Sequence, residues 1–187
     1  MNYQNIICWG DSQTFGARSY GCYPLYLAKI LNSASPYVWR AINRSSNGFT
    51  ARDLWFMINQ EIDSLHDIYQ ACLLIGTNDV GEHTPPALFA EYYRQMIQTL
   101  RIKRYKAIYC GEIPPIYADG HVFFSHQTPG ARNEYNALIQ TTLREFPNTH
   151  WVTFPTLTRE DYEDSVHFNE SGNEKVAQAF AQAILAR

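Results

Sequence analysis

The chain has 187 residues, of which 45% are hydrophobic and 18% charged, with a formal net charge of -3 at pH 7. This length and composition are typical of one soluble globular domain over residues 1–187, and they exclude a disordered chain. The slight negative charge argues against a nucleic-acid binder, and no apolar run is long enough to span a membrane. Because residues 1–5 lack a basic region and the first apolar run is too short for a signal peptide, we expect a cytoplasmic protein.

Short apolar runs recur along the chain, and we interpret five of them as strands. They cover residues 6–9, 37–42, 71–75, 107–110 and 150–154. Four of these runs are almost continuously apolar or aromatic, which is the pattern of a parallel sheet buried on both faces. The second run contains Arg40 and is the weakest of the five.

Five longer segments carry apolar residues at the i, i+3, i+4, i+7 spacing of amphipathic helices. These stripes consist of Tyr23, Leu27, Ile30 and Leu31; Leu54, Ile58 and Ile62; Phe89, Tyr92, Tyr93, Met96, Ile97 and Leu100; Tyr135, Leu138, Ile139, Thr142, Leu143 and Phe146; and Val176, Ala179, Phe180, Ala183 and Ile184. Strands that alternate with helices predict an α/β fold with helices on both sheet faces. For the last helix, a capping box of Ser171 with Glu174 competes with an N-cap at Asn169.

The cysteines and histidines do not predict a metal site. No C-x-x-C pair is present, and Cys8, Cys72 and Cys110 each lie in a predicted strand, so we expect them to be small buried hydrophobic residues. His121 and His126 share one segment, but nothing beside them completes a set of ligands. The sequence also lacks H-E-x-x-H, Walker and G-x-G-x-x-G motifs, so we expect no metal and no organic cofactor.

Polar residues follow the ends of the predicted strands. In an open parallel sheet, ligands bind beyond the carboxyl ends of the strands. Ser12 follows the first strand, Asn43 leads from the second towards Gly48, and Asn78 follows the third. The longest irregular stretch, residues 112–129, follows the fourth strand, and long loops in compact domains are often functional.

The segment after the fifth strand contains Asp164 and His167, which could form a catalytic triad with Ser12. A serine hydroxyl needs a base to take its proton, and the base needs a carboxylate to hold its tautomer. Residues three apart come together if their segment forms a helical turn. Asp161 and Glu163 are rival carboxylates for the same role. Each residue alone could be a turn, cap or surface residue, but together at successive strand ends they favour catalysis.

Four blocks of the sequence resemble those of the SGNH (GDSL) hydrolases. The first is Gly10-Asp11-Ser12-Gln13-Thr14-Phe15-Gly16, and the second, a looser match, is Asn43 with Gly48. Gly76-Thr77-Asn78-Asp79 is similar to the third block, and Asp164-x-x-His167 to the last. The blocks occur in order and span almost the whole chain. No departure from the family pattern removes a required residue.

The resemblance implies a flavodoxin-like three-layer α/β/α sandwich with a five-stranded parallel sheet. It also implies Ser12 as nucleophile, His167 as base and Asp164 as its orienting partner, with an oxyanion hole from the Ser12 and Gly48 N–H groups and the Asn78 side chain. A helix N-terminus after Ser12, the missing Cβ of Gly48 and the neutral amide of Asn78 suit these roles. We assign Asp11 and Asp79 mainly to hydrogen bonding within loops.

These expectations point to a serine ester hydrolase that acts on a small-molecule ester. The five strands and their helices use nearly the whole chain, and among the loops residues 112–129 are long enough to form a wall or lid. We therefore expect short acyl groups such as acetyl, with acetylated carbohydrates as one candidate class. An acyltransferase, a lysophospholipase or thioesterase, and a non-catalytic flavodoxin-like binding module are the alternatives. The sequence does not indicate the oligomeric state.

Overall fold

The computed structural model describes residues 2–118, 122–125 and 127–187. Its centre is a five-stranded, all-parallel sheet with the strand order β2-β1-β3-β4-β5. The strands are β1 (Tyr3–Gly10), β2 (Val38–Ser45), β3 (Gln70–Leu74), β4 (Ala107–Gly111) and β5 (Thr149–Val152). The α/β fold and all five predicted strands are therefore confirmed.

All five strands differ from their predicted bounds, by one residue at β3 and β4 and by more at β1, β2 and β5; β1 begins at Tyr3 instead of residue 6. β2 extends to Ser45 and pairs with β1 along its whole length, although it contains Arg40. β2 is an edge strand, so Arg40 can remain exposed and place its guanidinium over the ring of Tyr3. β5 ends at Val152 instead of residue 154.

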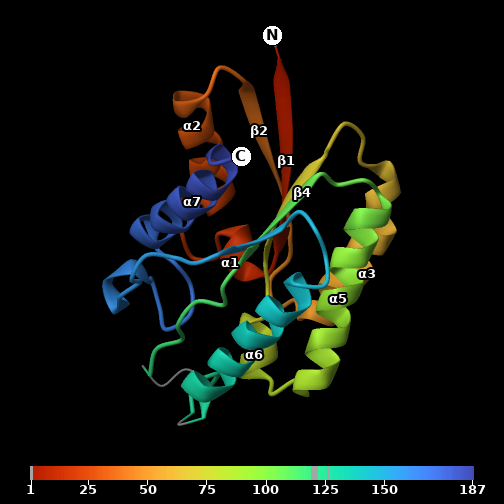
Figure 1. Cartoon of the computed structure of the whole chain (residues 1–187). Helices are drawn as coiled ribbons and strands as arrows, with labels where there is room; N and C mark the ends of the chain where they lie inside the picture. Colours follow the sequence, from red (N-terminus) through yellow and green to blue (C-terminus); the bar gives the residue numbers. More distant parts are fainter. Residues whose placement is uncertain (1, 119–121, 126) are drawn as a thin grey trace.

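Helices cover both faces of the sheet and give it three layers (Figure 1). α2 (Tyr23–Ala34) and α7 (Glu170–Leu185) pack together on one face. α3 (Ala51–Glu61), α5 (Pro86–Ile102) and α6 (Thr128–Leu143) cover the other face. The apolar stripes predicted for these helices supply 18 of the 44 residues that the structure places in the two buried cores, and the strands, the loops and other helical residues supply the rest.

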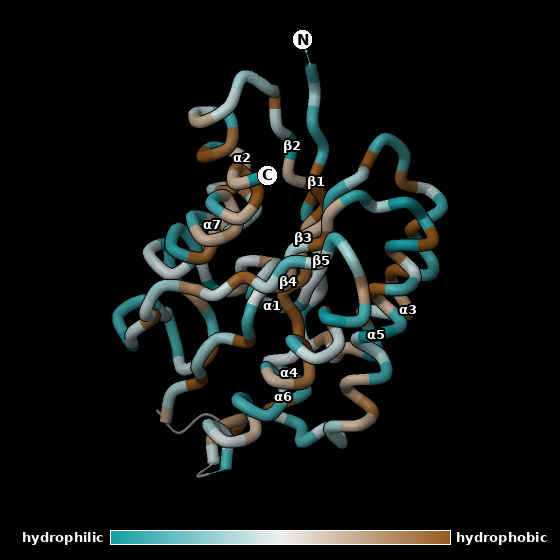
Figure 2. Tube along the Cα trace, in the orientation of Figure 1, coloured by the Kyte–Doolittle hydropathy of each residue, from teal (hydrophilic) through white to brown (hydrophobic). Residues whose placement is uncertain are grey.

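The residues of β1 show why its sequence is apolar without alternation. Ile7 and Trp9 belong to the core under α3 and α5, whereas Ile6 and Cys8 belong to the core under α2 and α7, and all four are fully buried. Figure 2 shows the same arrangement, with hydrophobic strands inside and hydrophilic segments on the outer helices. Three cysteines are buried in strands, as predicted: Cys8, Cys72 and Cys110.

Two short helices lie at the carboxyl edge of the sheet. α1 (Ser12–Phe15) follows β1 directly, and α4 (Thr77–Gly81) follows β3. The chain places β2 on one side of β1 and β3 on the other, so the strand order reverses here. Ligands of open α/β sheets bind at such a switch point. The fold therefore brings the ends of β1 and β3 together at the expected place for a site.

The last helix begins with an asparagine cap. The Gly172 N–H donates to Asn169 Oδ1 at 3.1 Å, so of the two alternatives the Asn169 cap forms and the capping box of Ser171 with Glu174 does not. α7 begins at Glu170, which places Ser171 inside its first turn. The Ser171 hydroxyl instead donates to Asp161 at 2.8 Å. Two 3-10 helices complete the chain, η1 (Ile62–Ser64) and η2 (Arg159–Asp161), and no helix of the described ranges is long and apolar enough to cross a membrane.

Candidate active site

The turn from β1 into α1 fixes the position of Ser12. Asp11 caps α1, because its Oδ1 accepts the Gln13 N–H at 2.9 Å. A Cβ atom on Gly10 would lie 2.4 Å from the carbonyl oxygen of Leu74, so the close approach of β1 and β3 requires glycine here. Ser12 is nearly buried at 5% exposure and lines a cavity at the sheet edge.

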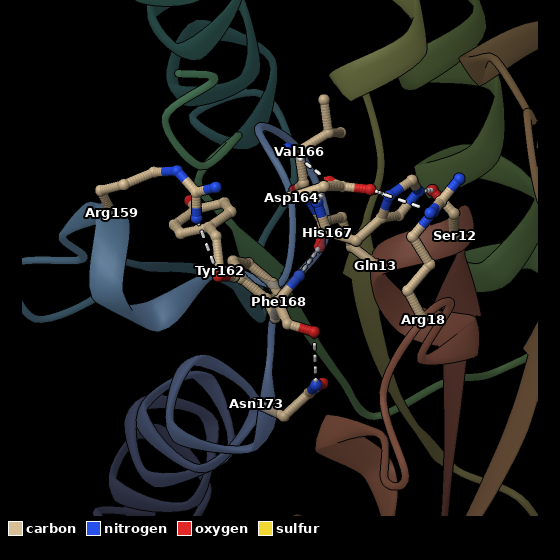
Figure 3. Close-up of polar contacts among 10 residues, drawn as sticks. All are labelled: Ser12, Gln13, Arg18, Arg159, Tyr162, Asp164, Val166, His167, Phe168 and Asn173. Carbon is tan, nitrogen blue, oxygen red and sulfur yellow. Dashed lines mark hydrogen bonds and ion pairs between the residues drawn. The ribbon is translucent and has the colours of Figure 1, made fainter. Parts of the chain in front are cut away.

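Ser12, His167 and Asp164 form a continuous row of hydrogen-bonded side chains (Figure 3). Nε2 of His167 lies 3.1 Å from the Ser12 hydroxyl, and Nδ1 lies 2.9 Å from Asp164 Oδ2. The structure thus brings together the three residues predicted as a triad. In this geometry a neutral imidazole with its proton on Nδ1 donates to Asp164 and can accept the serine proton at Nε2.

Asp164 reaches His167 through a tight turn and not through the helical turn expected from their spacing. The backbone from Glu163 to His167 consists of bends, and Asp164 Oδ1 accepts the N–H groups of Val166 and His167 at 2.8 and 2.7 Å. An aspartate that bonds the backbone two residues ahead favours such a turn over a helix. Partial burial alone would raise the pKa of Asp164, but hydrogen bonds from the His167 N–H, the His167 ring and the Val166 N–H lower it to about 2. The carboxylate therefore stays ionised at neutral pH.

The two rival carboxylates serve other contacts. Asp161 accepts hydrogen bonds from Ser171 and Lys175, at 2.8 Å each, and its side chain is buried at 3% exposure. Glu163 is exposed, and its backbone N–H, not its carboxylate, contacts the His167 backbone at 2.8 Å. Neither carboxylate contacts the His167 ring. Of the three candidates, Asp164 alone does so.

The residues predicted for an oxyanion hole face the same cavity as Ser12. This cavity has a volume of about 600 Å³, and its lining includes Ser12, Gly48, Asn78 and His167. Gly48 has a φ of 78°, which lies in the region that favours glycine. The Asn78 amide donates one hydrogen to the Phe49 carbonyl at 2.8 Å, which leaves its second hydrogen for a ligand. Within the described part of the chain, the N–H groups of Ser12 and Gly48 have no acceptor.

Two buried aspartates support the loops below this cavity, as predicted. Asp11 holds α1, and Asp79 Oδ2 accepts the N–H of Ala51 at 2.8 Å at the start of α3. Burial, together with the charge of Asp79, raises the pKa of Asp11 to about 7, against the hydrogen bond from the Gln13 N–H. Burial likewise raises the pKa of Asp79 to about 6, against its hydrogen bond from Ala51.

Asn43 and Glu112 occupy supporting positions outside the cavity. The Asn43 amide donates to the Thr14 carbonyl at 2.8 Å and so joins β2 to α1. Glu112 accepts the Phe154 N–H at 2.7 Å and pairs with Arg132 at 3.4 Å. Neither side chain lines the cavity around Ser12. The second sequence block therefore contributes one residue to the cavity lining and one to its support.

Gln13 is a functional candidate that the sequence did not single out. Its amide N–H donates to the Val166 carbonyl, and its Oε1 accepts the Phe168 N–H at 3.3 Å. These two contacts lie on either side of His167, and Gln13 is buried at 2% exposure. The residue next to Ser12 thus clamps the segment that carries the base. The sequence contains one weak indication of this role, which is that Gln13 is a polar residue directly after the predicted nucleophile.

Arg18 also lies at the site without a signal in the sequence. Its Nε is 3.1 Å from Asp164 Oδ2 (Figure 3), and Arg18 lines the same cavity as Ser12 and His167. The side chain is 68% exposed, so solvent weakens this ion pair. Arg18 belongs to the loop between α1 and α2, which carries no motif.

Part of the irregular stretch 112–129 forms a wall of the site, as expected. Phe123 lines the cavity, and the Tyr117 N–H donates to the Ser165 carbonyl at 2.8 Å, so Tyr117 supports the segment between Asp164 and His167. α6 already begins at Thr128, within the stretch. His121 and His126, considered above as metal ligands, lie outside the described residues.

Comparisons with known proteins bear on the family and the fold of this chain. The model of the GDSL-like lipase/acylhydrolase family matches residues 8–175. A lipase/acylhydrolase from Enterococcus faecalis superposes with a TM-score of 0.79 at 20% identity, over 98% of this chain and 96% of that one. An acetyl xylan esterase gives 0.76 at 21% identity, over 96% and 99% of the two chains.

A family 3 carbohydrate esterase from Clostridium thermocellum gives a TM-score of 0.79 at 18% identity, over 99% of this chain and 98% of that one. At this level of identity the solved structures show a shared fold. The search of curated proteins gives no match. The family model spans most of the chain, and its range includes Ser12, Gly48, Asn78, Asp164 and His167. The chain therefore belongs to the GDSL-like lipase/acylhydrolase family, whose members are also called SGNH hydrolases.

Proposed function

We propose that the protein is a serine ester hydrolase that removes short acyl groups, with acetylated carbohydrates as its substrates. The observation that carries this proposal is the hydrogen-bonded row Asp164–His167–Ser12 beside a cavity that Gly48 and Asn78 also line. Nucleophile, base, orienting carboxylate and oxyanion donors are the parts that acyl transfer through a serine requires.

The reaction proceeds in two steps. Ser12 Oγ attacks the carbonyl carbon of the ester while His167 Nε2 takes the serine proton, and Asp164 stabilises the imidazolium. The oxyanion accepts hydrogen bonds from the Ser12 and Gly48 N–H groups and from Asn78. His167 then gives its proton to the leaving alcohol, and the acyl-enzyme remains. Water attacks this intermediate, His167 takes and returns its proton, and the carboxylic acid leaves with Ser12 restored.

The lining of the Ser12 cavity supports a short acyl group. Four of its twelve lining residues carry apolar side chains: Phe15, Ala17, Phe123 and Val166. Each methylene of a long acyl chain needs apolar surface to gain about 0.8 kcal/mol. Polar residues such as Ser19 and Asn47 share the same wall. The cavity therefore favours a small acyl group and a polar alcohol.

The fold comparisons give independent support for the carbohydrate class. Two of the similar structures are described as an acetyl xylan esterase and a carbohydrate esterase, and a third as a carbohydrate acetylesterase from Sinorhizobium meliloti. These descriptions concern those proteins. They make acetylated sugars the first substrates to test for this one.

The test is a panel of acetyl, butyryl, octanoyl and palmitoyl esters of one alcohol, together with acetylated sugars. We expect kcat/KM to fall as the acyl chain grows, and Ser12→Ala to lower kcat by about 10³–10⁶-fold. Ser33→Ala is the matched control, because Ser33 is exposed on α2 and bonds its own helix. Normal turnover by Ser12→Ala would contradict the proposal.

The same preparation separates the alternative functions. A rise in kcat/KM towards octanoyl or palmitoyl esters would favour a lysophospholipase or thioesterase. Formation of a new ester when acceptor alcohols are added would indicate an acyltransferase. A fluorophosphonate should label Ser12, and failure to do so would favour a binding module without catalysis.

A further inference from the structure

We propose that a second cavity, which adjoins the Ser12 cavity, is a subsite for another sugar ring in the alcohol part of the substrate. This inference rests on the proposed function and extends it to the length of the substrate. The second cavity has a volume of about 570 Å³. It is lined by Arg18, Ser19, Tyr20, Glu163, Asn169, Glu170 and Ser171. We call it the outer cavity.

The outer cavity adjoins the reacting atoms. Arg18 and Ser19 line both cavities, so they form the boundary between them. Arg18 is held at this boundary by its contact with Asp164 at 3.1 Å. Figure 3 shows this contact, and Ser12 and His167 line the same cavity as Arg18. A substrate with its ester at Ser12 can therefore reach the outer cavity by passing Arg18.

The lining of the outer cavity determines what can bind there. No residue of its lining is aliphatic, so it does not suit an acyl chain. Glu163 and Glu170 are both exposed on its wall and outnumber the single cation, Arg18, which disfavours an anionic ligand. The carboxylate, guanidinium and hydroxyl groups of the lining can together accept hydrogen bonds from, and donate hydrogen bonds to, the hydroxyl groups of a neutral ligand. A neutral polyhydroxy compound fits this chemistry.

Tyr20 gives the outer cavity an aromatic surface. Its side chain is fully exposed, at 101% of the reference accessibility, so its ring is available for a ligand. Phe15 is 53% exposed and lines the Ser12 cavity, so each cavity carries one exposed aromatic ring from the same segment of the chain. The electron-rich face of an aromatic ring attracts the C–H groups on the face of a sugar. Two such rings in adjoining cavities suit two successive sugar rings of one oligosaccharide.

The experiment compares substrates that differ in length alone. We would measure kcat/KM for 4-nitrophenyl acetate and for β-1,4-linked xylose mono-, di- and trisaccharides that carry one acetyl group at the same position. The variants are Tyr20→Ala and Tyr20→Phe. Tyr37→Ala is the matched control, because Tyr37 is also exposed but precedes β2, at the opposite edge of the sheet.

The wild type and Tyr37→Ala should prefer the disaccharide over the monosaccharide by roughly five- to tenfold in kcat/KM, the effect of one aromatic contact. Tyr20→Ala should lose this preference and keep its rate on 4-nitrophenyl acetate, whereas Tyr20→Phe should retain both. Equal rates on the mono- and disaccharide would overturn the subsite and leave the proposed function intact. A preference that survives Tyr20→Ala would also overturn it. No hydrolysis of any ester would contradict the proposed function itself.

Discussion

Nε2 of His167 lies 3.1 Å from Oγ of Ser12, although the two residues are 155 positions apart in the sequence. The two ends of the chain meet here because Gln13, next to Ser12, holds the backbone on both sides of His167. A reacting pair must keep its distance and direction to within a fraction of an ångström. The alignment of Ser12 with His167 therefore depends on a side chain that touches neither the Ser12 hydroxyl nor the His167 ring.

Replacing Gln13 tests this dependence. Gln13→Leu keeps a similar size but removes the donor to Val166 and the acceptor for Phe168. We expect kcat to fall by about 10–100-fold with little change in KM, because alignment and not substrate binding is lost. The rate of labelling by a fluorophosphonate should fall in parallel. Gln60→Leu, at an exposed position of α3, is the control. A variant that loses folding stability but labels at the wild-type rate would show that Gln13 serves the fold alone.

Asp164 and Asp161 give a matched pair of carboxylates for the orienting role. Asp164→Asn should lower kcat by roughly 10²–10⁴-fold, because an amide facing Nδ1 favours the wrong tautomer of His167. Asp161→Asn should leave kcat close to the wild-type value, since Asp161 contacts Lys175 and Ser171 instead. Steady-state kinetics of the two variants measures the difference. Similar small losses in both would mean that another group orients His167.

The same pair should behave in the opposite way in unfolding experiments. Asp161 is buried, and its contacts join η2 to α7, so Asp161→Asn should lower the melting temperature by several degrees. Asp164 is more exposed, and solvent weakens its contact with Arg18. We therefore expect Asp164→Asn to change the melting temperature less than Asp161→Asn does.

The sequence predicted the sheet and its edge well, because burial leaves a pattern that can be read locally. Continuous apolar runs marked the strands that are covered on both faces. The apolar pattern of β2 was the weakest of the five, because an edge strand tolerates a charged residue such as Arg40. Strand ends also predicted the residues that line the Ser12 cavity, since parallel strands place their carboxyl ends together. The catalytic roles of these residues stay predictions until the variants are measured.

Other parts of the site could not be predicted, because they depend on how distant loops meet. The contact of Gln13 with the backbone around His167 arises from the packing of α1 against a loop at the other end of the chain. Arg18 reaches Asp164 from an exposed loop without periodicity. The turn at Asp164 was missed for a different reason, because spacing alone does not distinguish a helical turn from an aspartate turn.

Asn78 should act on kcat more than on KM. Its free amide hydrogen would meet negative charge that develops in the transition state, so Asn78→Ala should lower kcat by roughly 10²–10³-fold. The control is Asn59→Ala, because Asn59 is exposed and likewise donates to a backbone carbonyl, that of Trp55, at 2.8 Å. A rise in KM with an unchanged kcat would place Asn78 in ground-state binding instead.

The buried carboxyl group of Asp11 should make stability depend on pH. Burial raises its pKa in the folded protein to about 7, above the ordinary value of 3.8, so the folded state binds this proton more tightly than the unfolded state. Folding stability from this group is therefore greatest below pH 4, falls as the pH rises from about 4 to 7, and is constant above that range. Asp11→Asn removes the titration, and its Oδ1 can still accept the Gln13 N–H.

Urea unfolding of the wild type and Asp11→Asn between pH 4 and 8 measures this contribution. The contributions of the other titrating groups to the free energy of unfolding largely cancel in the difference between the two proteins. Asp79 is the exception, because the loss of the Asp11 charge makes Asp79 easier to ionise. We expect Asp11→Asn to gain stability relative to the wild type as the pH rises through this range, by an amount on the order of a few kcal/mol. A constant difference between the two proteins would mean that Asp11 titrates in the folded protein as it does in the unfolded chain, and that the polar groups around it solvate its charge.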